Sequence, residues 1–217
     1  MNRSLLSAVV VLLAFAAGGA GGAELNGRVV ADSPESPAIV WIEGAAGGAV
    51  PQENTVITHL QGGSFEPEVS VGFVGNDFVF RNEDDTLHTT HLYLHLARQQ
   101  EISGRPLVNG ATVYNIALPR TGMEVVRPIL AYHTYREETG PIEVKCNLHP
   151  DETADLLVFG HSFATLTGEG GEFAIKDIPA GTHDVWVWHG GTARKWATVD
   201  FSHSGSVEQI IEIEDSE

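Results

Sequence analysis

The sequence is poor in cysteine, methionine and basic residues, and each scarcity excludes a class of structure or partner. With one cysteine in 217 residues, the chain can form no internal disulfide and none of the paired-cysteine zinc motifs. Only 12 Lys and Arg residues stand against 29 Asp and Glu, which gives a formal charge of −17. Nucleic acids and anionic membrane surfaces need a basic footprint, so neither is expected as a partner. After residue 23, no run approaches the roughly 20 apolar residues of an integral membrane span.

The one long apolar run lies at the N-terminus. Arg3 precedes the apolar stretch from Leu5 to Ala17, and small residues follow as far as Ala23. This order is typical of a secretory signal peptide, so we expect residues 1–23 to be cleaved and the mature protein to be periplasmic or secreted. Retention of the segment as an anchor is the alternative. Cleavage removes one arginine, and 11 basic against 29 acidic residues then leave a formal charge of −18.

Helical periodicity is also scarce. Apolar residues alternate in short runs that are separated by Gly, Pro, Asn and Asp, the pattern of an all-β sandwich. The predicted strands are Gly27–Val30, Ala38–Ile42, Glu68–Val74, Asp77–Arg81, Val113–Leu118, Val125–Leu130, Ile142–Lys145, Asp155–Phe159, Phe163–Thr167, Glu172–Ile175, Val185–Trp188 and Ala197–Phe201.

The mature chain has two segments that differ in residue composition. Residues 55–160 have aromatic strands and most of the histidines, whereas residues 161–217 alternate glycine-rich turns with short strands. The turns and strands at Gly168–Phe173, Ile178–Gly181 and Val185–Trp188 resemble carboxypeptidase-regulatory or transthyretin-like modules. That resemblance implies a small β-sandwich in 161–217, with which the strands of residues 24–54 would pair. A single elongated sandwich is the alternative.

The lone cysteine, Cys146, needs an explanation in an exported protein. In an oxidising compartment an unpaired thiol is buried and inert, joined to another chain, or bound to a metal. Cys146 follows a predicted strand and His149 lies in the loop after it. Cys-x-x-His spacing allows a thiolate and an imidazole to reach one ion from a single loop. A buried structural cysteine beside a surface histidine is the alternative.

A second imidazole is expected from the segment that ends at His88. A predicted strand runs to Asn82, an acidic turn follows, and His88 lies where the next strand begins. In this order of Asn, His and Cys-x-x-His, residues 65–159 resemble the cupredoxins, especially plastocyanin-like and methylamine-utilisation proteins. The resemblance implies a Greek-key β-sandwich in residues 55–160 and copper held by His88, Cys146 and His149. It also implies one-electron exchange with a redox partner protein.

The fourth ligand departs from the family pattern. Relatives commonly carry a methionine shortly after the loop histidine, whereas this chain has His149-Pro-Asp-Glu152. Glu152 is therefore the expected axial ligand, and Met123, or no residue, is the alternative. A carboxylate is harder than a thioether and would favour Cu(II) and lower the reduction potential. His91, on one strand face with Tyr93 and His95, is the alternative to His88.

No pattern of a hydrolase or a nucleotide-binding enzyme is present. The chain has no Gly-x-Ser-x-Gly elbow, and its glycine run at residues 168–171 precedes a predicted strand rather than a helix. We therefore expect a copper-binding electron carrier and not an enzyme. A copper carrier or storage protein and a metal-free binding or assembly module are the alternatives.

Overall fold

The computed structural model describes residues 22–32, 36–95, 101–102, 105–106, 110–203 and 205–213. Among these residues the regular structure consists of strands and one 3₁₀ turn, η1 (Ala131–His133). The prediction of an all-β protein is therefore confirmed. Residues 1–21, which include most of the expected signal peptide, lie outside the described residues. Within the described part, no helix is long and apolar enough to cross a membrane.

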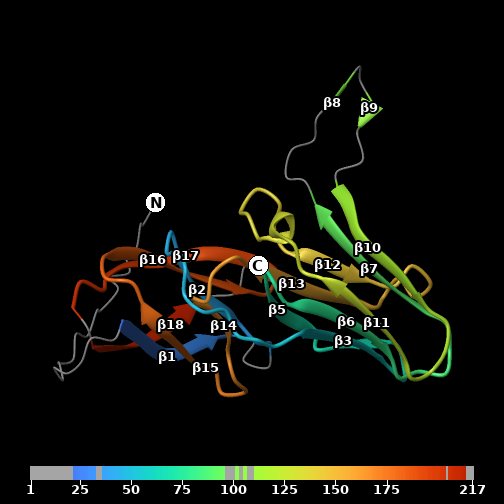
Figure 1. Ribbon diagram of the computed structural model, residues 1–217, viewed down its shortest axis with the longest axis horizontal. Coiled ribbons are helices and arrows are strands. Elements are labelled where there is room, and N and C mark those ends of the chain that lie inside the picture. The colour runs from blue at the N-terminus through green and yellow to red at the C-terminus, as the bar shows by residue number, and fades with distance from the viewer. Residues whose placement is uncertain are drawn as a thin grey trace, which may run out of the picture.

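Two sheets form the half of the molecule that contains Cys146, which we call the site sandwich (Figure 1). The five-stranded sheet has the order β10 (Gly110–Leu118), β7 (His88–His95), β12 (Ile142–Lys145), β13 (Thr153–Phe159) and β5 (Val69–Phe73). The four-stranded sheet has the order β11 (Met123–Pro128), β6 (Asp77–Asn82), β3 (Thr55–Leu60) and β4 (Ser64–Glu66). A separate two-stranded ribbon joins β8 (Glu101–Ile102) to β9 (Arg105–Pro106).

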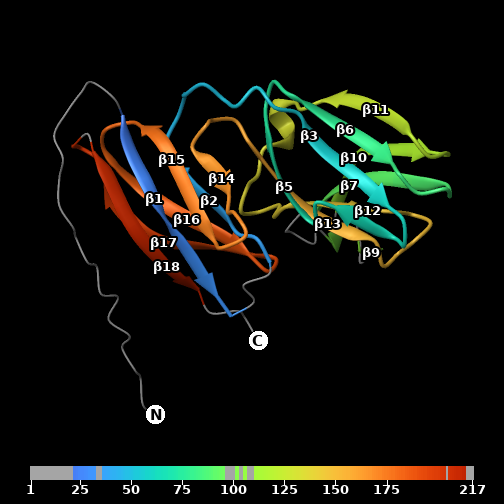
Figure 2. The ribbon, with the colours of Figure 1, turned by 90° about the horizontal axis from the view of Figure 1, so that it is seen from below.

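Two further sheets form the second half, which we call the flanking sandwich (Figure 2). The first has the order β15 (Glu172–Ile178), β1 (Ala23–Ala31) and β18 (Ser206–Ile213). The second has the order β14 (Ala164–Leu166), β2 (Ile39–Glu43), β16 (Thr182–His189) and β17 (Thr192–Asp200). Within the described residues, the N-terminal strands β1 and β2 thus pair only with strands that follow residue 160. The domain boundaries at residues 54 and 160 stay a prediction.

Alternation of side chains along the strands explains how the halves pack. On β13, Leu156 and Val158 belong to the core of the site sandwich, whereas Leu157 and Phe159 face the other way. Because successive side chains of a strand point to opposite faces, one strand can serve two apolar layers. Leu157 and Phe159 pack with Trp41 of β2 in a separate apolar cluster, which joins the site sandwich to the flanking sandwich. The buried layer fixes the strands that carry the site, because protein cores are close-packed.

Candidate metal centre

The loop that carries Cys146 and His149 is closed by its own backbone. The peptide N–H of Glu152 donates to the carbonyl of His149 at 3.0 Å, and the N–H of Cys146 donates to the carbonyl of Glu152 at 3.2 Å. Pro150 occupies the second position of the resulting four-residue turn, where its fixed φ is favourable. This loop joins β12 to β13. It therefore presents Cys146, His149 and Glu152 at one end of the site sandwich.

The loop between β6 and β7 is organised by Asn82, which is fully buried. Its Nδ2 donates to the carbonyls of Thr86 and Leu118, and its Oδ1 accepts the N–H of Asp84. These bonds supply backbone partners inside a tight acidic turn, as a short polar side chain commonly does. His88 then begins β7, antiparallel to β12. Its buried ring reaches the loop of Cys146.

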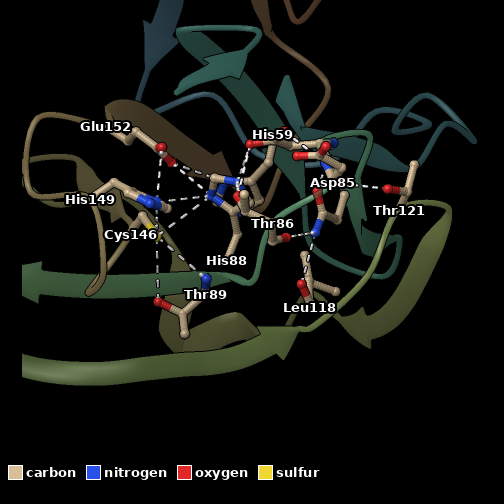
Figure 3. Close-up of polar contacts among 12 residues, drawn as sticks. His59, Asp85, Thr86, His88, Thr89, Leu118, Thr121, Cys146, His149 and Glu152 are labelled. Carbon is tan, nitrogen blue, oxygen red and sulfur yellow. Dashed lines mark hydrogen bonds and ion pairs between the residues drawn. The ribbon is translucent and has the colours of Figure 1, made fainter. Parts of the chain in front are cut away.

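Four side chains converge at this end of the sandwich (Figure 3). His88 Nδ1 lies 3.8 Å from Cys146 Sγ and 3.2 Å from His149 Nδ1. His149 Nδ1 lies 3.5 Å from Cys146 Sγ. The Glu152 carboxylate completes the group, with Oε2 3.2 Å from His88 Nδ1 and Oε1 3.1 Å from His149 Nδ1. The structure thus brings together all four residues that the sequence predicted as metal ligands.

The cluster brings several hydrogen-bond acceptors to one point. Nε2 of His88 lies 2.9 Å from Asp84 Oδ2, and an ionised carboxylate can only accept, so the ring proton belongs on Nε2. In the neutral ring, His88 Nδ1 is then a lone pair that lies near a sulfur, another ring nitrogen and a carboxylate. Oε1 of Glu152 is buried and, despite its 3.1 Å contact with His149 Nδ1, makes no hydrogen bond to any residue that the structure describes. A buried acceptor without a partner is unfavourable, and a cation among these atoms would satisfy the Glu152 oxygen and the His88 lone pair together.

The separations also match the edges of a coordination polyhedron. Bonds of about 2.0–2.3 Å from nitrogen and sulfur to one tetrahedral ion place the ligand atoms about 3.3–3.6 Å apart. The contacts among His88, Cys146, His149 and Glu152 span 3.1 to 3.8 Å. A thiolate with two imidazoles is a soft donor set that suits copper. These residues therefore fit a copper ion.

The surroundings of Cys146 lower the pKa of its thiol. Burial alone raises its pKa, but N–H groups of Thr89, Leu148 and His149 and the ring of His88 outweigh burial and lower the pKa from 9.0 to about 7. The thiolate is the form that binds metals. The pKa of His88 is raised, because its contacts with Asp84, Cys146 and Glu152 outweigh a burial effect that lowers it.

His59 also belongs to the cluster, and sequence reasoning missed it. Its ligand atom lies within 4.8 Å of those of His88, Cys146 and Glu152. Burial, followed by the charges of His88 and His149, lowers its pKa from 6.5 to about 3, so the ring is neutral. The segment Thr55–Leu60 was not among the predicted strands. Its β-branched residues, Thr, Val, Ile and Thr, were the available signal of a strand.

His91 and Met123, the two alternative ligands, make other contacts. The ring of His91 contacts Asn147 Oδ1 and Thr112 Oγ1, both at 2.9 Å, on the half-buried face of β7. Met123 begins β11 opposite Asn82 and packs against the apolar core of the site sandwich. Of the two candidates for the first histidine, His88 is the one that contacts Cys146.

Comparisons with known proteins give weak matches. No family model and no curated protein matches the sequence. Among solved structures, a purple cupredoxin from Nitrosopumilus maritimus is 15% identical, covers 48% of this chain and 99% of its own length, and has a TM-score of 0.31. A reduced amicyanin variant is 15% identical over 55% of this chain and 98% of its own length, with a TM-score of 0.33. A Cu(I) form of another amicyanin variant has a TM-score of 0.31 at the same identity and coverage. Scores this low decide neither the detailed fold nor the function.

Proposed function

We propose that this protein binds copper through His88, Cys146, His149 and Glu152 and carries single electrons to or from a protein partner. The observation that carries the proposal is the convergence of one thiol, two imidazole nitrogens and a buried carboxylate, one oxygen of which makes no hydrogen bond among the described residues. When bound, copper would supply one-electron exchange between its two oxidation states. The proposed function does not depend on the resemblance of residues 24–54 and 161–217 to a transthyretin-like module.

The ligands come from well-fixed parts of the fold, which suits electron transfer. His88 begins β7, an interior strand of the five-stranded sheet, and Cys146 and Glu152 flank two more of its strands. His88, Cys146 and Glu152 are no more than 3% exposed. A rigid, buried donor set keeps the same geometry in both oxidation states, so little reorganisation accompanies electron exchange.

His149 supplies the route to a partner. Its side chain is 42% exposed, whereas the other three proposed ligands are buried. Leu87 and Leu148, the chain neighbours of His88 and His149, are 45% and 49% exposed. Apolar side chains around a single exposed imidazole edge form a surface on which a partner can approach the centre closely. The expected periplasmic or secreted location stays part of the proposal.

A coulometric redox titration of the copper-loaded protein tests the proposed function. We expect one electron per copper, complete reversibility over repeated cycles, and retention of copper in both states. A copper carrier or storage protein would instead release the metal to a chelator on a change of oxidation state. Release of that kind, or failure of the protein to bind copper at one equivalent, would contradict the electron-carrier proposal.

A further inference from the structure

His59 lies deeper in the site sandwich than the proposed ligands and has two polar contacts. It is carried by β3, in the sheet opposite to the one that positions Cys146. Its side chain is completely buried. Nδ1 lies 3.2 Å from Glu152 Oε2, and Nε2 lies 2.9 Å from Thr90 Oγ1. Glu152 and Thr90 are themselves 3% and 0% exposed, so water cannot replace either contact.

The direction of these hydrogen bonds follows from which groups can donate. A neutral imidazole carries one N–H, an ionised carboxylate only accepts, and a threonine hydroxyl can do either. The His59 proton therefore lies on Nδ1 and is donated to Glu152, while Nε2 accepts the hydroxyl proton of Thr90. Both ring nitrogens are occupied in this arrangement. Service of His59 as a metal ligand would break one of the two bonds.

The His59 ring and the Glu152 carboxylate are also held in place by packing. The ring of His59 packs against those of Phe65 and His88, at centroid distances of 4.3 and 4.5 Å. On the carboxylate, Gly63 has a φ of +83° and a Cβ at that position would come 3.0 Å from Glu152 Oε1. A side chain at position 63 would thus crowd Oε1, while His59 contacts Oε2. Such a carboxylate has little freedom to rotate.

We propose that His59 is a positioning residue whose Nδ1–H fixes the Glu152 carboxylate as the fourth ligand of the centre. The inference rests on the proposed function, because it gives Glu152 a role that exists only when copper is bound. Outer contacts of this kind orient metal ligands and tune the metal. An anionic oxygen ligand favours Cu(II). By holding the Glu152 carboxylate in position to bind copper, the His59 contact therefore lowers the reduction potential of the centre.

The test compares the Cu(II) electron paramagnetic resonance spectrum and the reduction potential of five proteins: wild type, His59→Leu, His59→Asn, Glu152→Gln and the double variant His59→Leu/Glu152→Gln. We expect Glu152→Gln to change the copper hyperfine splitting and raise the potential. His59→Leu should shift both in the same direction, because the carboxylate loses its donor. His59→Asn should stay near wild type, since its amide can donate from about the position of Nδ1. The double variant His59→Leu/Glu152→Gln should match Glu152→Gln alone, because coupled sites are not additive.

Several outcomes would overturn the inference while leaving the proposed function intact. A wild-type spectrum in His59→Leu beside an altered one in Glu152→Gln would show that His59 only packs. Loss of copper from His59→Leu but not from Glu152→Gln would make His59 a ligand itself. Should His59→Leu fail to fold, Thr90→Val carries the same test, because it removes the partner of Nε2 and should shift both readouts in the same direction by less. An unchanged spectrum in Glu152→Gln would instead refute the fourth ligand of the proposed function.

Discussion

Replacement of Asp84 by Asn should weaken copper binding, although Asp84 is not a proposed ligand. It contacts His88 at Nε2, whereas Nδ1 is the atom that would bind copper. Asp84 Oδ2 lies 2.9 Å from His88 Nε2, and Thr86 Oγ1 lies within 3.0 Å of both. The hydrogen bond from His88 lowers the pKa of Asp84 from 3.8 to about 2, so the carboxylate is ionised and keeps the ring proton on Nε2. An asparagine amide can present N–H to Nε2 instead, which moves the ring proton to Nδ1, where copper would have to displace it.

Loss of a carboxylate that orients a metal-ligating histidine typically lowers metal affinity about 10- to 100-fold. We expect a loss of that size in Asp84→Asn, measured by competition with a chromophoric chelator under anaerobic conditions at neutral pH. Asp85→Asn is the matched control, because Asp85 is exposed and the substitution changes the net charge equally. Equal affinities in the two variants would refute the tautomer argument and leave only a general charge effect.

Three further predictions concern the stability of the protein and the choice of histidine ligand. Burial lowers the pKa of His133 from 6.5 to about 4, so the unfolded state binds this proton first; stability is retained above pH 6.5 and falls toward pH 4 by up to about 3 kcal/mol, at about 1.4 kcal/mol per pKa unit. In His133→Phe the free energy of unfolding, measured by urea at a series of pH values, should fall less between pH 6.5 and pH 4 than in the wild type. An equal fall in the two proteins would contradict the assignment. Copper at a free concentration 100 times its Kd should stabilise the fold by about 2.7 kcal/mol and raise Tm, and removal by a chelator should reverse the gain. His91→Ala should leave copper stoichiometry and the optical spectrum unchanged, because both ring nitrogens of His91 contact residues outside the cluster.

The local parts of the site were predictable from the sequence. Cys146, His149 and Glu152 lie within seven residues, and a turn that contains Pro150 brings them to one point. His88 follows a strand-ending Asn82 and begins the next strand, which the sequence also indicated. Short loops have few conformations, so spacing within them carries geometric information.

The remote parts were not predictable. His59 lies 93 residues from Glu152 in the chain, and β3 pairs with β6 in parallel. A single polar residue in a short strand gives no indication of which side chain it will face. The strand β18 (Ser206–Ile213) was also missed, although its sequence mixes polar residues with Val and Ile, which are common in strands. Its parallel pairing with β1 joins opposite ends of the chain, and no local pattern specifies such a partner.

The most direct test of the account is the optical and electron paramagnetic resonance spectrum of the copper-loaded protein, recorded beside Cys146→Ser. The account predicts one Cu(II) per chain and an intense thiolate-to-copper charge-transfer band that is absent from the serine variant. Hydroxyl oxygen cannot supply that transition, whereas the variant keeps both imidazoles and the carboxylate. Persistence of the band in Cys146→Ser, or its absence from the wild-type protein, would contradict a copper centre built on this thiolate.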